Sequence, residues 1–146
     1  MARKKQKAFT GFGMSLIGLF AFAVFMNLNF RTVIVDGRSM LPTLNPEERV
    51  VVSKAYWLVG PVHDGDIVVI HDPTAPGFII KRVFRMGGEQ VPVDKWPSFH
   101  HLTEGPYTVP EGNVFVLGDN LTQSEDSRVF GPVPFNRIVG KVVVRP

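Results

Sequence analysis

A long apolar run dominates the beginning of the chain. Residues 8–30 carry no charged side chain, and large apolar residues recur on every face of a helical projection. As a helix at about 1.5 Å per residue, the run covers roughly 34 Å, enough for a hydrocarbon core of about 30 Å. The pattern therefore predicts a transmembrane anchor over residues 8–30 rather than a buried helix of a soluble protein.

A removable signal peptide is the alternative interpretation of the same run. A basic start and an apolar core also describe such peptides, and Ala21-Phe22-Ala23 offers a small-x-small cleavage pattern. Apolar residues continue beyond Ala23, however, and the uncharged run exceeds the core of about 7–15 residues that signal peptides have. We prefer a retained anchor, and cleavage after Ala23 stays open.

Beyond the apolar run, the pattern changes to short β-branched segments separated by Gly, Pro, Asn and Asp. Such segments are typical of strands joined by turns, and no helical period appears among them. The predicted strands are residues 32–35, 49–52, 67–70, 78–83, 90–93, 114–117 and 138–144. The sequence thus predicts a mainly β protein, in which residues 31–146 form a compact antiparallel β-barrel or sandwich behind one N-terminal transmembrane helix.

Residues 94–113 have the least regular pattern in this β domain. Trp96 and Phe99 stand among prolines and histidines there. The segment is either a packed surface loop or a foot at the membrane interface, because tryptophan favours the headgroup zone. We prefer the packed loop.

The charge distribution gives the predicted anchor its direction. The formal net charge is +3, but four of the 16 basic residues lie within residues 1–7. The remaining 12 basic residues stand against 13 acidic ones, so we expect no nucleic acid partner, and a lipid bilayer suits the basic tail better. Because basic flanks stay in the cytoplasm, residues 1–7 are predicted to be cytoplasmic and residues 31–146 to lie across the membrane.

Composition also limits the chemistry. The chain has no cysteine, which excludes disulfides, thiolate catalysis and cysteine-based zinc sites. Its four histidines lack the His-Glu-x-x-His spacing of a metal site, and no Gly-rich phosphate loop is present. We expect neither a metal nor a cofactor.

Lys81 and Arg82 stand side by side in an apolar predicted strand. Alternation places Lys81 with Ile79 and Val83 and Arg82 on the opposite side, so at least one cation emerges among apolar side chains. Burial lowers the pKa of a lysine and leaves a neutral amine that can act as a general base, whereas a guanidinium stays charged. Such a base could activate Ser39, which otherwise is an ordinary turn serine. Which cation faces Ser39 stays open here.

A third segment follows the predicted strand 114–117. Gly118-Asp119-Asn120 forms a polar turn, and hydroxyl, carboxylate and guanidinium groups come soon after it at Ser124, Asp126, Ser127 and Arg128. This segment is either a structural loop or a support in which a hydroxyl orients the lysine amine and ion pairs fix the loop. The two interpretations are compatible.

Together these segments resemble the boxes of type I signal peptidases, the membrane-anchored serine/lysine proteases of bacteria with relatives in the mitochondrial inner membrane. The matching segments come in the family order: residues 39–44, 65–69, 81–83, 118–120, 124–128 and 131–133. Two features depart from some members. Gly37 stands where some carry a hydroxyl, and residues 84–117 are too few for the extra β domain of larger members.

The resemblance implies a role for each candidate residue. Ser39 would be the acyl-enzyme nucleophile, with its backbone N–H near the oxyanion, and Lys81 would be the general base. Ser124 would orient the lysine. The supporting ion pairs would be Asp126 with Arg128 and Asp119 with Arg82, and the substrate-binding residues would be Met40 and Pro42.

The implied function is removal of signal peptides from exported preproteins at the inner (plasma) membrane, after small residues one and three positions before the cut. A mitochondrial inner-membrane-type peptidase of the same family is the first alternative. A self-cleaving repressor shares the core but carries a DNA-binding region, of which no sign is visible here. A membrane-tethered β module that binds peptides without cutting them would need neither Ser39 nor Lys81.

Overall fold

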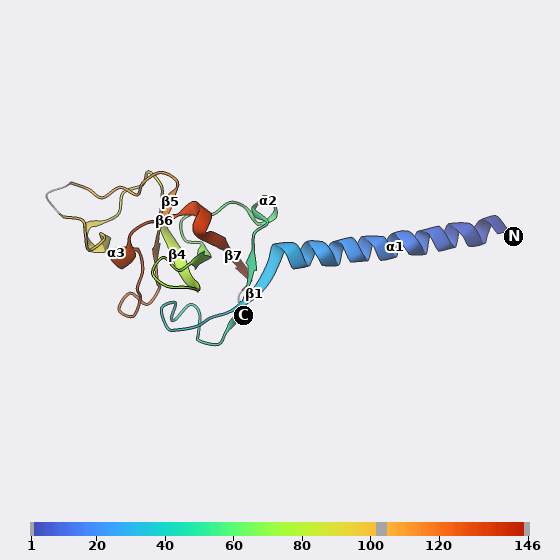
Figure 1. Ribbon diagram of the computed structural model, residues 1–146, viewed down its shortest axis with the longest axis horizontal. Coiled ribbons are helices and arrows are strands. Elements are labelled where there is room, and N and C mark those ends of the chain that lie inside the picture. The colour runs from blue at the N-terminus through green and yellow to red at the C-terminus, as the bar shows by residue number, and fades with distance from the viewer. Residues whose placement is uncertain (1, 102–104, 145–146) are drawn as a thin grey trace.

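The computed structural model describes residues 2–101 and 105–144, with the backbone alone over residues 2–12 and at residue 144 (Figure 1). One long helix, α1 (Ala2–Asn29), projects from a body built mainly of strands. β1 (Phe30–Ile34) follows at once, so Phe30 begins a strand rather than ending the apolar helix. In the described part of the chain, no helix has both the length and the hydropathy that crossing a bilayer requires. The anchor over residues 8–30 stays a prediction.

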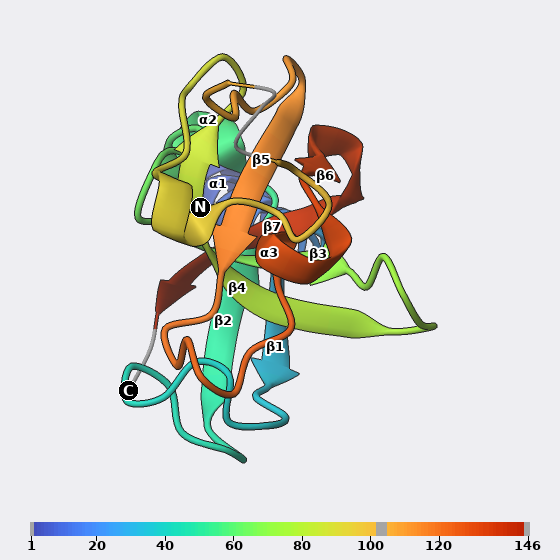
Figure 2. The ribbon, with the colours of Figure 1, turned by 90° about the vertical axis from the view of Figure 1, so that its left-hand side faces the viewer.

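The body is one antiparallel sheet of seven strands in the order β1-β2-β7-β3-β4-β5-β6. The strands after β1 are β2 (Arg49–Ser53), β3 (Ile67–His71), β4 (Phe78–Met86), β5 (Asn113–Leu117), β6 (Val133–Pro134) and β7 (Ile138–Val144). Irregular registers in three of the pairings add to the natural twist and curl the sheet (Figure 2). The predicted mainly β, antiparallel architecture is confirmed. Because β1 and β6 end the strand order among the described residues, the sheet is a curled half-barrel rather than a closed barrel or a sandwich of two sheets.

Two local predictions were also wrong. Residues 90–93 form no strand: Gln90 makes an isolated bridge to Thr108, and Pro92, which lacks an N–H, precedes a 3-10 turn, η1 (Val93–Lys95). Helical turns that the sequence pattern did not predict occur at α2 (Tyr56–Val59), α3 (Ser127–Phe130) and η3 (Phe135–Arg137). Each is a single turn, too short to show a helical period.

The loop that contains Trp96 is packed against the sheet, as preferred from the sequence. The Trp96 Nε1–H donates to the Val91 carbonyl at 2.7 Å, and its ring lies against a cluster that includes Tyr107 and Phe115. Part of the predicted irregular segment, residues 102–104, lies outside the described residues. Where it is described, this segment extends the core.

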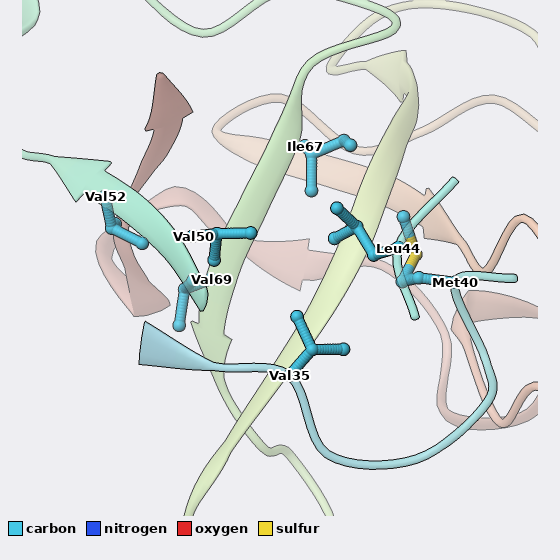
Figure 3. Close-up of a cluster of buried hydrophobic side chains, with 7 residues drawn as sticks. All are labelled: Val35, Met40, Leu44, Val50, Val52, Ile67 and Val69. Atoms are coloured by element: carbon cyan, nitrogen blue, oxygen red, sulfur yellow. The ribbon is translucent and has the colours of Figure 1, made fainter. Parts of the chain in front are cut away.

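The central strand β3 explains how the core is divided. Ile67 and Val69 pack into one buried cluster, whereas Val68 and Ile70 pack into another, because successive strand residues point to opposite faces. Figure 3 shows the first of these clusters, whose members from the β1–β2 connection face the sheet. These members are Val35, Met40 and Leu44. They fasten the connection that carries Ser39.

Candidate active site

Ser39 lies in a connection that the core holds on both sides of it. Met40 and Leu44 are 1% and 0% exposed, and the Leu44 N–H donates to the Met40 carbonyl at 2.9 Å (Figure 3). Before the serine, Gly37 has φ of +84°, a conformation that glycine adopts without steric cost. Ser39 itself is half-buried, so its hydroxyl stands at the edge of the core rather than inside it.

Lys81, in the middle of β4, is the buried cation of the site. It is 4% exposed and shares its side of the strand with Val83, as the alternation predicted. Its Nζ donates to the Ser39 Oγ at 2.7 Å. Burial lowers the pKa of Lys81, while the charges of Asp126, Asp72 and Glu125 work in the opposite direction. Burial thus favours the neutral amine, the form that can take a proton from the serine hydroxyl.

Arg82 serves a different partner on the other side of the strand. Its Nε and Nη2 donate to Asp119 Oδ1 and Oδ2 at 2.8 and 2.6 Å, and its Nη1 donates to the Gly65 carbonyl at 2.7 Å. The bond to Asp119 raises the pKa of Arg82. Asp119 is within reach because the register pairs Arg82 with Leu117, two residues before it. Of the two neighbouring cations, therefore, Lys81 faces Ser39 and Arg82 binds the turn after β5.

Gly118 marks the place where the three segments meet. A Cβ on this residue would lie 2.2 Å from the Ser124 Oγ and 2.5 Å from the Ser39 carbonyl oxygen, so only glycine fits. The Ser124 hydroxyl is buried, and it has no hydrogen-bond partner among the described residues. The bond from Ser124 to Lys81 that the resemblance implies is not formed in this structure. An unpaired buried hydroxyl is costly, so Ser124 has the capacity for a further hydrogen bond.

Asp126 ties the same loop to the end of β5. Its carboxylate is fully buried and accepts from Arg128 Nε and Nη2 at 2.8 and 2.9 Å, and from the Gly118 N–H at 3.0 Å. Burial alone would raise its pKa, but the bonds from Arg128 and Gly118 and the nearby Ser124 hydroxyl hold it below its ordinary value. The Ser124 contact lacks the geometry of a full hydrogen bond. Asp126 is therefore a fixed negative charge near Lys81.

The two residues expected to bind substrate lie in different environments. Met40 is part of the buried cluster under the Ser39 segment, whereas Pro42 is exposed after a cis Leu41–Pro42 bond. Pro42 is accessible to a peptide, whereas Met40 packs in the core and supports the segment that contains Ser39. Both substrate-binding roles stay predictions. In the described part of the chain, no group of three or more His, Asp or Glu side chains could hold a metal ion.

Known proteins share this arrangement of segments. A family model described as signal peptidase, peptidase S26, matches residues 9–96 and 94–145. The chain belongs to this family. The resemblance to type I signal peptidases that the sequence suggested is thereby confirmed.

Three relatives in this signal peptidase family, two from bacteria and one from a plant, illustrate the similarity. A signal peptidase I of Leptolyngbya laminosa is 34% identical, over 91% of this chain and 77% of that protein. A signal peptidase I of Bacillus caldolyticus is also 34% identical, over 80% of this chain and 79% of the relative. The mitochondrial ATP-independent inner membrane protease subunit 1a of Arabidopsis thaliana is 36% identical, over 78% and 68%.

Asn120 is a site residue that the sequence interpretation treated only as part of a turn. The Asn120 backbone N–H donates to the Ser39 carbonyl at 2.9 Å, and the Asn120 Nδ2 donates to the Arg38 carbonyl at 3.1 Å. Its Oδ1 accepts from Thr122 Oγ1 at 3.1 Å, which orients the amide. Asn120 thus holds the segment that contains Ser39 through two hydrogen bonds. Nothing in the local sequence indicates a partner 82 positions away.

Proposed function

We propose that this chain is a serine endopeptidase that removes N-terminal signal peptides from exported preproteins, with Ser39 and Lys81 as a catalytic dyad. Membership of the signal peptidase family and the two relatives named signal peptidase I support the activity. The observation that carries the residue assignment is the 2.7 Å contact between the Nζ of a buried lysine and the Oγ of a half-buried serine. Neither side chain alone would indicate catalysis.

The proposed chemistry follows from the proton transfers that are possible between Ser39 and Lys81. The neutral Lys81 amine accepts the Ser39 hydroxyl proton while Oγ attacks the carbonyl carbon of the scissile peptide. The Ser39 backbone N–H makes no hydrogen bond among the described residues, which leaves it available for the oxyanion. Protonated Lys81 then gives its proton to the leaving amine. In the second half of the reaction, Lys81 accepts a proton from a water molecule that attacks the acyl carbonyl, and it returns that proton to the Ser39 Oγ as the acyl–oxygen bond breaks.

The substrate would bind as an extended strand beside the Ser39 and Lys81 segments, with small residues one and three positions before the cut. Exposed Pro42 would border this strand and Met40 would support it from the core. Ser124 would complete the site by bonding the lysine amine when substrate excludes water. Asp119 with Arg82, and Asp126 with Arg128, would hold the surrounding turns.

We place residues 8–30 in the inner (plasma) membrane as a single-pass anchor, residues 1–7 in the cytoplasm, and residues 31–146 outside as the catalytic domain. The surface of α1 supports this placement, because Ile17, Phe20 and Leu28 are 71%, 72% and 67% exposed on this helix. A helix that is apolar on all faces requires a buried or lipid environment. The lipid bilayer is thus a proposed partner of the chain.

A mitochondrial inner-membrane-type peptidase is a second candidate, favoured by the Arabidopsis relative. It would use the same dyad in a different membrane, so the residue assignments would not change. The two candidates differ in the preproteins that they process.

Cleavage of a model preprotein in detergent tests the proposed function. The intact protein, Ser39→Ala and Lys81→Ala would be compared after circular dichroism has established that each is folded. We expect only the intact protein to cut, after a small-x-small site. Normal cleavage by the folded Lys81→Ala variant would refute the base assignment, and a folded intact protein that cuts no preprotein would favour the non-catalytic peptide-binding module.

A further inference from the structure

Trp57 is the most exposed large apolar side chain that the structure describes. It is 76% exposed, and its neighbour Leu58 is 55% exposed, both on the short helix α2. Large apolar side chains that gather at one place on a surface mark a site of interaction. Trp96, the only other tryptophan, is instead packed and bonded to the Val91 carbonyl. The two tryptophans therefore have opposite environments.

The position of α2 follows from the first hairpin of the sheet. β1 begins where α1 ends, and β2 runs back along it with Phe30 opposite Ser53. The Lys54 N–H then donates to the Asn29 carbonyl at 3.0 Å, which fastens the chain just before α2 (Tyr56–Val59) to the last residue of α1. Figure 1 shows the result: α2 lies on the side of the body from which α1 leaves.

An aromatic contact sets the level of Trp57 along α1. The rings of Trp57 and Phe25 lie 5.9 Å apart between centroids. Phe25 precedes the helix end at Asn29 by four residues, which is about 6 Å along the helix axis. Trp57 thus stands beside the last turn of α1 and continues its apolar surface.

Cationic side chains border this apolar surface on the body side. Arg31 and Lys54 are exposed, and both line a small hollow with Leu28 at the junction of α1 and the sheet. An apolar tip with adjacent cations suits the boundary between acyl chains and phosphate groups, where tryptophan is enriched. Binding of a soluble protein would not require the apolar surface of α2 to continue that of α1.

We propose that α2 is a second membrane contact, a foot in which Trp57 and Leu58 enter the headgroup zone while Arg31 and Lys54 face lipid phosphates. This inference rests on the proposed placement of α1 in the bilayer. One helix alone would leave the tilt of α1 and the attached body relative to the bilayer unrestrained. A second contact fixes this tilt, and with it the direction in which Ser39 faces the membrane surface.

Tryptophan quenching in vesicles tests the foot with an internal control. The full chain would be reconstituted as two single-tryptophan variants, Trp96→Phe, which retains Trp57, and Trp57→Phe, which retains Trp96. The vesicles would contain phosphatidylcholine and phosphatidylglycerol with acyl chains brominated either near the headgroup or near the methyl end. Flotation of each sample would report separately whether the chain is held by the bilayer.

We expect Trp57 emission to shift to shorter wavelength and to be quenched by the shallow bromines more than by the deep ones, while Trp96 is quenched by neither. If the protein floats with the vesicles and Trp57 is quenched no more than Trp96, the foot is refuted while the anchor stands. If the protein does not float, the anchor placement fails and the foot fails with it. Neither result bears on the proposed peptidase activity, which is tested separately by cleavage in detergent.

Discussion

At the scale of single residues, Lys81 is an ionisable side chain whose burial costs free energy. The residue is 4% exposed, and its amine makes its hydrogen bond to a neutral hydroxyl rather than to a carboxylate. Asp126, Asp72 and Glu125 attract the charged form, yet burial outweighs them and the pKa is lowered. Removing a charged amine from water is unfavourable, so the proposed base is buried at a cost in stability.

Lys81→Met should abolish activity and raise the free energy of unfolding at neutral pH. The folded-state pKa of Lys81 is lowered, so the unfolded chain binds its proton more readily, and the native state is penalised at every pH below the ordinary value of 10.5. Removing the amine should therefore stabilise the native state relative to the unfolded chain. Urea unfolding of both proteins at neutral pH and near pH 10.5 would measure this. The difference should shrink at the higher pH, and a destabilised variant would contradict the account.

Asn120→Ala should reduce kcat about tenfold while KM changes little, because the Arg38 carbonyl loses its clamp and the nucleophile segment loosens. The backbone bond to the Ser39 carbonyl remains, so the loss of stability should be only about 1 kcal/mol. Asn113→Ala is the matched control, since the side-chain amide of Asn113 donates to the nearby Pro110 and Glu111 carbonyls. Equal kinetic effects of the two variants would show that the clamp has no catalytic importance.

At the scale of elements, the end of β5 brings the site together. The β4–β5 register pairs Arg82 with Leu117, so the chain leaves β5 beside the two cations of β4. The following loop then folds back, and the Gly118 N–H bonds the buried Asp126 at 3.0 Å. The β4–β5 pairing thus positions the turn after β5, and that turn positions the segment that contains Ser39.

Gly118→Ala tests this arrangement by adding one methyl group. The new Cβ would meet the Ser124 Oγ at 2.2 Å and the Ser39 carbonyl at 2.5 Å, so one of them must move. We expect near-complete loss of cleavage and a loss of stability of about 1–3 kcal/mol, as overpacking usually causes. Gly18→Ala, where a Cβ meets nothing within 4 Å, is the control. Full activity of Gly118→Ala would show that the close approach is not required.

At the scale of the whole molecule, the sequence predicted what depends on local pattern. Six of the seven predicted strands are present, because β-branched runs between turns determine them locally. The strand over residues 90–93 was wrong because Pro92 removes a ladder donor. β6 was not predicted because two residues, Val133 and Pro134, show no alternation.

Closure of the sheet and the partners of individual side chains are long-range properties that no local pattern contains. Alternation placed Lys81 and Arg82 on opposite sides of β4, but only the packed chain decides which of them faces Ser39. In the same way, the sequence placed Asn120 in a turn without indicating its bonds to the Ser39 segment. The family resemblance suggested the roles of the candidate residues, and the structure gives the distances between their side chains.

The most direct test of the central claim is the rate at which Ser39 is acylated as pH is varied. A peptide p-nitrophenyl ester that ends in alanine would be mixed with the intact protein and with Lys81→Met, and mass spectrometry would locate the acyl group. We predict acylation of Ser39 by the intact protein, at a rate that rises as Lys81 deprotonates and levels off below its ordinary pKa of 10.5. Acylation at another residue, or an equal rate and pH profile in Lys81→Met, would contradict the dyad.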